Sequence, residues 1–197
     1  CNEAFLEGLL NHSAQWEFRT TWMSFFLSKS IINNDDINLL WKLTLLGDET
    51  VIRNTEGLWL LVSVVKSTDY FIDVVKKVTE ICMYSIINRF QCSQADIIHI
   101  VLDSFKGDND ERSDELLELI KVIGSSFFKP SELSEFFTKV QMKQSIKLIQ
   151  ILTDIIQATC NNTLIGIRSF FHIGYLPYLK EKAKAKSKFS ISKTKID

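Results

Sequence analysis

The chain has 197 residues and a formal net charge of −1, with 46% hydrophobic and 24% charged side chains. These proportions exclude a disordered chain, and a chain of this length forms one domain or one compact run of repeats. The sequence contains only seven glycines and two prolines. That scarcity argues against a β-sandwich or barrel, because such folds need frequent turns.

Apolar side chains recur with a helical period from one end of the chain to the other. Residues at positions i, i+3, i+4 and i+7 share one helix face. Segment 131–140 places apolar residues at these positions, namely Leu133, Phe136, Phe137 and Val140. Read along the chain, the same pattern predicts about ten helices. They lie at residues 3–12, 14–30, 36–46, 50–66, 69–89, 93–106, 111–125, 131–140, 142–159 and 162–175.

Three of these segments carry further expectations. Segment 50–66 is apolar on more than one face between Leu58 and Val65, so we expect this helix to be buried between neighbours. Segment 69–89 is too long for a strand and does not alternate, so it is predicted as a single helix. Ser93 and Asp96 resemble a capping box, which predicts that the next helix begins at Ser93.

Taken in pairs, the predicted helices form five hairpins that begin near residues 3, 36, 69, 110 and 142. These intervals are close to one helix–turn–helix repeat of roughly 34 residues. The layout resembles a short α-solenoid of the tetratricopeptide or HEAT kind, built of stacked antiparallel hairpins. An irregular orthogonal helical bundle, similar in length to Bcl-2-like domains, is the alternative. We expect one all-helical domain over residues 1–179 and a basic, flexible tail over 180–197.

The expected compartment is intracellular, either nuclear or cytoplasmic. The four cysteines form no CxxC pair, and Cys82 falls within a helical pattern, which favours a small core residue over a disulfide framework. The longest apolar run, residues 58–65, is far shorter than the roughly 20 residues that span a bilayer. We therefore expect no membrane association.

The sequence has none of the short motifs that mark common catalytic sites. Its three histidines lie on separate predicted helices or at their edges, so we expect no enzyme activity, no cofactor and no metal. Arg168 and His172 lie one helical turn apart. They resemble the helix-borne arginine–histidine motif of HEPN-type ribonucleases, which implies RNA cleavage. That motif has four to six residues between the two, whereas three intervene here, so we expect these residues to mark the end of a helix.

The predicted tail is rich in lysine. Residues 180–197 hold seven lysines and two carboxylates, which leaves the rest of the chain acidic. Lysine occupies alternate positions at Lys180, Lys182, Lys184, Lys186 and Lys188. Such a cluster can contact phosphates through counterion release. A nucleic-acid-associated helical repeat that uses this tail is therefore an alternative function.

The favoured interpretation is a non-catalytic helical scaffold or adaptor that binds another protein through a groove or an exposed aromatic patch. Stacked hairpins create extended binding surfaces, and aromatic anchors supply much of the energy of an interface. The expected anchors are Trp16, Trp22, Phe25 and Phe26, together with the free end of the array. The sequence leaves the oligomeric state and the partner's identity open.

Overall fold

The computed structural model describes residues 15–29 and 31–161. The helices in these residues are α2 (Gln15–Leu27), α3 (Asn34–Leu45), α4 (Thr55–Val65), α5 (Phe71–Met83), α6 (Ile86–Gln94), α7 (Ile97–Ser104), α8 (Ser113–Gly124), α9 (Pro130–Lys143) and α10 (Ile146–Asn161). No strand occurs in this part of the chain, so the prediction of an all-α protein is confirmed. The predicted helices at 3–12 and 162–175 and the tail at 180–197 lie outside the described residues.

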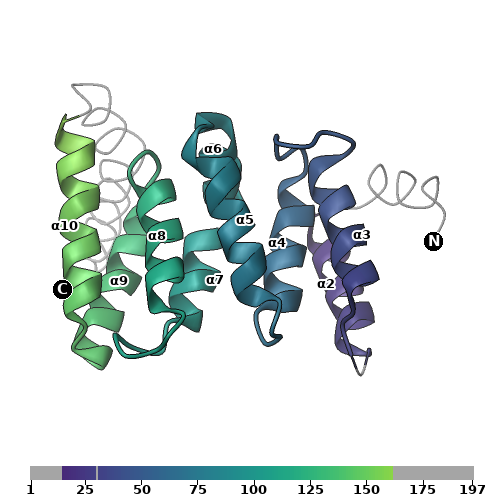
Figure 1. Cartoon of the computed structure of the whole chain (residues 1–197), viewed down its shortest axis with the longest axis horizontal. Coiled ribbons are helices and arrows are strands. Elements are labelled where there is room, and N and C mark those ends of the chain that lie inside the picture. The colour runs from purple at the N-terminus through teal and green to yellow at the C-terminus, as the bar shows by residue number, and fades with distance from the viewer. Residues whose placement is uncertain (1–14, 30, 162–197) are drawn as a thin grey trace, which may run out of the picture.

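The helices lie side by side, broadly in chain order, along the longest axis of the molecule (Figure 1). α2 and α3 form one end of this row, and α9 and α10 form the other. α4 packs on α2 and α3, α8 packs on α5, α7 and α10, and α9 packs on α7 and α10. Each helix therefore contacts helices that are near it in the chain.

α4 lies in the middle of the core, as its sequence predicts. Side chains on several of its faces are buried: Leu58, Leu60, Leu61, Val62 and Val65. Its first turn is capped by Asn54, whose side-chain oxygen accepts hydrogen bonds from the backbone amides of Glu56 and Gly57. The helix begins at Thr55 and not near residue 50, because residues 48–54 form the loop that leads into this cap.

The prediction of a single helix over 69–89 is wrong. α5 ends at Met83, and α6 begins at Ile86 with Ser85 as its N-cap. The Ser85 hydroxyl accepts a hydrogen bond from the amide of Asn88 at 3.2 Å. Asn88 is fully buried, and its side chain bonds the carbonyls of Thr50 and Ile81 and the amide of Ile52. These bonds hold α6 at an angle to α5 that a continuous helix does not allow.

The predicted start of the following helix at Ser93 is also wrong. Ser93 lies inside α6 and is buried, and α7 begins at Ile97. Asp96 precedes α7 with a φ of 54°, in the left-handed region, and its side chain makes no capping hydrogen bond to that helix. The sharp turn at residues 95–96 therefore replaces the capping box that the sequence pattern indicated.

A regular interval appears in the contacts between helices. α2, α4, α7 and α9 form a series in which each member packs on the next. Hydrogen bonds that a side chain makes to another helix, or to the loop beside it, recur between residues 33 to 39 positions apart. Examples along the series are Arg19 with Glu56, Lys66 with Asp103, and His99 with Glu135.

Candidate partner-binding surface

A groove of about 970 Å³ lies between α2 and α3, at one end of the row. Apolar and aromatic side chains form much of its wall: Trp22, Phe25, Leu39, Trp41 and Leu45. Charged groups of both signs stand beside them, among them Lys29, Asp35, Lys42 and Asp48. A largely apolar groove with a few polar groups at its edge is the usual form of a binding site for another molecule.

Three of the four predicted anchor residues meet in one aromatic cluster on α2. The ring centroids of Trp22 and Phe25 are 5.7 Å apart, those of Trp22 and Phe26 are 6.1 Å apart, and those of Phe25 and Phe26 are 5.2 Å apart. Rings at these separations attract one another beyond their buried area. The helical spacing i, i+3 and i+4 brings the three side chains to neighbouring positions on one side of α2.

The three rings have different exposures, which separates their roles. Phe26 is only 2% exposed and belongs to the core, whereas Phe25 is 47% exposed and lines the groove. Trp22 is half-buried and also lines the groove. Phe25 and Trp22 therefore present ring surface to the groove, and Phe26 supports them from beneath. The side chain of Trp16, the fourth predicted anchor, lies outside the described residues.

Lys29 and Asp36 fix the edge of the groove. The Lys29 ammonium forms an ion pair with the Asp36 carboxylate and lies 5.2 Å from the centre of the Phe25 ring. Asp36 also accepts a hydrogen bond from the amide of Asn33, and the Asn33 side chain accepts one from the amide of Asp36. This reciprocal capping box begins α3. The Lys29–Asp36 ion pair thus joins the segment after α2 to the first turn of α3, at one edge of the groove.

The groove is anchored to the rest of the molecule by cation–π contacts and an ion pair. The Arg19 guanidinium on α2 bonds both carboxylate oxygens of Glu56 on α4, at 2.5 and 3.0 Å, and lies 4.7 Å from the ring centre of Trp59. The Lys77 ammonium on α5 lies 4.4 Å from the ring centre of Trp41 on α3. A bidentate arginine–carboxylate pair fixes orientation as well as distance. Both groove helices are therefore tied to the next helices in the row.

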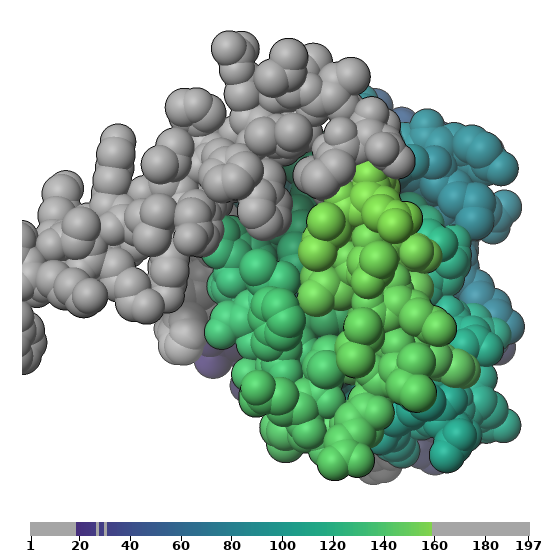
Figure 2. Space-filling view, turned by 90° about the vertical axis from the view of Figure 1, so that its left-hand side faces the viewer, coloured from purple at the N-terminus to yellow at the C-terminus, as the bar shows by residue number. Residues whose placement is uncertain are grey.

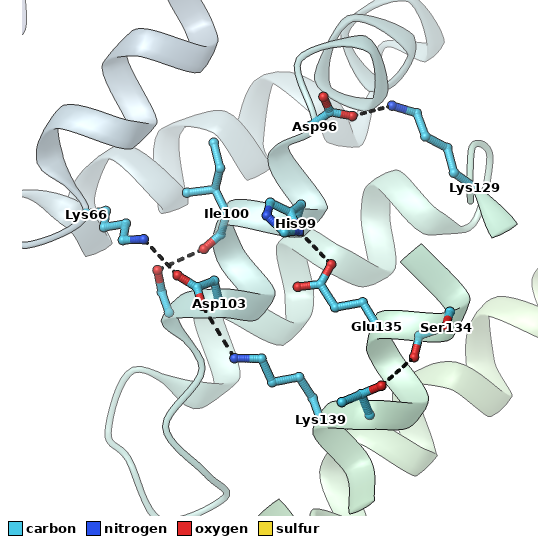
Figure 3. A network of polar contacts seen from close by, with 11 residues as sticks. Lys66, Asp96, His99, Ile100, Asp103, Lys129, Ser134, Glu135 and Lys139 are labelled. Atoms are coloured by element: carbon cyan, nitrogen blue, oxygen red, sulfur yellow. Dashed lines mark hydrogen bonds and ion pairs between the residues drawn. The ribbon is translucent and has the colours of Figure 1, made fainter. Parts of the chain in front are cut away.

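A ladder of charged groups joins α4, α7 and α9 (Figure 3). Asp103 on α7 lies between Lys66 on α4, at 2.8 Å, and Lys139 on α9, at 3.6 Å. The hydrogen bond from Lys66 is the main reason why the pKa of Asp103 lies below its ordinary value. The Asp103 carboxylate thus pairs with an ammonium group from each side, and these contacts hold α7 between α4 and α9.

Two further polar contacts extend this ladder along the same two helices. The His99 Nδ1 atom on α7 lies 2.6 Å from Oε2 of Glu135 on α9, and Asp96 lies 2.6 Å from the Lys129 ammonium (Figure 3). In the part of the chain that the structure describes, no group of three or more histidine, cysteine, aspartate or glutamate residues could hold a metal ion.

Glu132 lies buried beside this ladder, in the first turn of α9. It is 3% exposed, and one carboxylate oxygen accepts a hydrogen bond from the Lys129 amide at 2.5 Å. The other oxygen has no hydrogen-bond partner among the described residues. Burial raises the pKa of Glu132 to about 7, against the lowering effect of the Lys129 amide and ammonium. This carboxyl group is the least well satisfied acid in its neighbourhood.

An exposed apolar patch lies on and beside α6, and the sequence pattern did not predict it. Tyr84 is 92% exposed, and its neighbours in the patch are Met83, Ile86, Ile87 and Phe90. The ring of Phe90 contacts that of Phe127 edge to face, with centroids 5.5 Å apart. Ser85, a good N-cap residue three positions before Asn88, is the sequence signal that could have revealed the break.

The end of the row formed by α9 and α10 also presents apolar side chains. Figure 2 looks onto this end, where α10 lies in front and α9 beside it. The exposed members of this set are Phe137, Met142, Ile146, Ile149 and Ile156. It is the described end opposite the groove. The prediction that a partner binds at the free end of the array therefore applies to two surfaces: the groove between α2 and α3, and this apolar surface of α9 and α10.

The remaining predicted site residues lie outside the described residues. They are the tail lysines Lys180, Lys182, Lys184, Lys186 and Lys188, and the pair Arg168 and His172. Among the described residues, no helix combines the length and the apolar character that a bilayer crossing demands.

Comparisons with known proteins identify no relative of this chain: no protein family matches it, and neither a curated protein nor a solved structure does.

Proposed function

We propose that this protein is a non-catalytic helical-repeat adaptor that binds a segment of another protein in the groove between α2 and α3. The observation that carries the proposal is the groove itself, with Phe25 and Trp22 on one wall and Leu39, Trp41 and Leu45 on the other. Aromatic side chains that are ordered before binding lose little conformational freedom on contact, so they make effective anchors.

The recurring contact interval supports the repeat part of the proposal. In a solenoid, each repeat contacts its neighbours in the same way, so equivalent contacts recur at one repeat length. The 33 to 39 residues that separate the bonded residues match the length of a helix–turn–helix repeat. Within this interpretation α2, α4, α7 and α9 are equivalent helices of successive repeats, since each packs on the next, and α6 is an insertion.

The character of the groove indicates the class of partner. Its apolar wall calls for aliphatic or aromatic side chains from the ligand, and Asp35 and Lys42 at its edge call for flanking charges of both signs. A volume of about 970 Å³ accommodates a few side chains and not a whole domain. A short amphipathic segment of another protein, such as one helix face, satisfies these requirements.

The test compares two phenylalanine-to-aspartate substitutions. Phe25→Asp introduces a charge into the groove, whereas Phe137→Asp does the same on α9, at a side chain of similar exposure (47% and 52%). Partners captured from cell extract by the wild-type chain are identified and their segments synthesised, and affinities for the three chains are then measured. We expect Phe25→Asp to weaken binding by about 30-fold or more, as loss of a central anchor does.

The control decides how the result is interpreted. Phe137→Asp should bind like the wild type, and circular dichroism should show that both variants keep their helices. Equal binding by all three chains, or equal loss in the two variants, would contradict the assignment of the groove.

A further inference from the structure

Two buried cysteines face each other where α5 meets α6. Cys82 lies in the last turn of α5 and Cys92 in the last turn of α6. Both are free thiols and fully buried, and their Sγ atoms are 3.4 Å apart. The sequence pattern predicts a single helix through residue 89 and gives no reason for these thiols to meet. The turn between α5 and α6 brings them together.

Polar contacts on both sides of the pair fix the backbone that carries it. The Nε atom of Arg89, one turn before Cys92 on α6, donates a hydrogen bond to the carbonyl of Cys82 at 2.8 Å. The Asn88 side chain donates to the carbonyl of Ile81 at 2.7 Å. Arg89 and Asn88 on α6 thus bond the backbone of α5 at Cys82 and at the residue before it. The short distance between the two sulfur atoms therefore follows from how α6 is held on α5.

We propose that Cys82 and Cys92 form an oxidisable dithiol, which hydrogen peroxide converts into a disulfide that locks α6 onto α5. A disulfide needs a sulfur separation of about 2.05 Å, and rotation about the side-chain bonds of two cysteines already in contact can supply the remaining approach. Two reactive groups held in contact react far faster than the same groups free in solution.

The chemistry balances with peroxide as the oxidant. The thiolate of one cysteine attacks a peroxide oxygen, the O–O bond breaks, and hydroxide leaves as the cysteine becomes a sulfenic acid. The second thiol then attacks that sulfur, the S–S bond forms and the S–O bond breaks. Each step releases one hydroxide, from the peroxide in the first and from the sulfenic acid in the second, and each hydroxide takes up the proton of one thiol to become water. Overall, two thiols lose two electrons and two protons, and one peroxide becomes two waters.

Burial sets the pace of this reaction. It raises the pKa of the Cys92 thiol, so little of that thiol is in the reactive thiolate form while α6 is closed on α5. α6 has nine residues, and Ile86, Ile87 and Phe90 are exposed on its outer side. Transient opening of this short helix gives peroxide access. The disulfide, once formed, closes a short ring that opposes the same opening.

The test uses variants that isolate the pair. A chain with Cys1→Ser and Cys160→Ser retains only Cys82 and Cys92, and a matched chain carries Cys82→Ser in addition. Both are reduced, exposed to hydrogen peroxide in their folded state, unfolded, alkylated and mapped by peptide mass spectrometry. We expect an intramolecular Cys82–Cys92 cross-link in the first chain alone. Hydrogen exchange of the amides in α6 should slow at least tenfold after oxidation and recover after reduction.

Several results would overturn the proposal. Recovery of Cys82 and Cys92 as free thiols or as sulfinic acids in the folded chain would do so, as would a cross-link that forms only in urea or between two molecules. Circular dichroism of the reduced chains checks that the serine substitutions leave the helices intact. If the cross-linked chain exchanges its α6 amides as fast as the reduced one, the locking of α6 is wrong.

Discussion

The buried carboxyl group of Glu132 makes the stability of the protein depend on pH. Its pKa in the folded chain is about 7, against an ordinary value of 4.5. Between these two pH values the folded chain keeps a proton that the unfolded chain has lost. The free energy of unfolding therefore falls as pH rises from about 4.5 to about 7, and the lost stability is not regained above pH 7.

The size of the effect follows from the same two values. The difference between them corresponds to a loss of about 3 kcal/mol between acid and alkaline pH. Glu132 is 3% exposed, so water does little to screen this loss. Replacing Glu132 by glutamine removes the charge and keeps an oxygen that can accept the hydrogen bond from the Lys129 amide. The glutamine NH₂ group then takes the place of the unpaired oxygen, at a cost of about 1 kcal/mol.

Glu132→Gln should therefore be more stable than the wild type at pH 8, by about 2 kcal/mol, and equal to it or slightly less stable at pH 5. Urea unfolding followed by circular dichroism at both pH values measures this difference. Glu118→Gln is the matched control, because it removes the same charge from an exposed position on α8 that stays hydrated in both the folded and the unfolded chain. If the free energies of unfolding of Glu132→Gln and the wild type change in parallel between pH 5 and pH 8, the reasoning is refuted.

Three further predictions concern packing and are measured by chemical unfolding. Phe26→Ala should lower the free energy of unfolding by about 3 kcal/mol, because its side chain is buried. Phe25→Ala should lower it by only about 1 kcal/mol, because that side chain is half-exposed. Equal losses would contradict the division of roles within the aromatic cluster. Asn88→Ala should cost about 3 kcal/mol, because it leaves the buried amide of Ile52 and the partly buried carbonyls of Thr50 and Ile81 without their partner. A loss below about 1 kcal/mol would show that water replaces the side chain. Gly57→Ala should destabilise the folded chain by about 1–2 kcal/mol despite the better helix propensity of alanine, since the added Cβ would lie 3.1 Å from the backbone of Leu43. A gain in stability would mean that α3 and α4 move apart freely.

The sequence predicts helices well where one apolar face packs against a neighbour. The predicted segment 111–125 corresponds to α8 (Ser113–Gly124), and 36–46 corresponds to α3 (Asn34–Leu45). In both, an apolar stripe of helical period coincides with the buried side, so local pattern and packing point to the same boundaries. Segment 131–140 likewise falls within α9 (Pro130–Lys143).

The break between α5 and α6 shows what the local pattern leaves out. Apolar residues continue through Met83, Ile86 and Ile87, so periodicity alone favours one helix. The bonds that hold α6 in its own direction join Asn88 to Thr50 and Ile52, 36 to 38 residues earlier in the chain. A contact at that distance is invisible to a reading of neighbouring residues. The meeting of Cys82 and Cys92 depends on the same turn.

The aromatic cluster on α2 illustrates the same limit at the candidate site. Composition and spacing select Trp22, Phe25 and Phe26 as a group, because they share one side of a helix. Which ring is buried depends on where α3 and α4 lie, and the sequence does not state this. The groove is therefore found only when Leu39 and Trp41 of α3 are placed opposite α2.

The way in which the helices contact one another determines how far a local change can spread. The groove helices α2 and α3 pack on α4, whereas α9 packs on α7 and α10. Changes at distant sites that share no contact usually contribute independently to stability. Substitutions at Glu132 on α9 and at Phe25 on α2 should therefore have additive effects on the free energy of unfolding. For the same reason we expect Phe137→Asp on α9 to leave the walls of the groove unchanged, which makes it a matched control for Phe25→Asp.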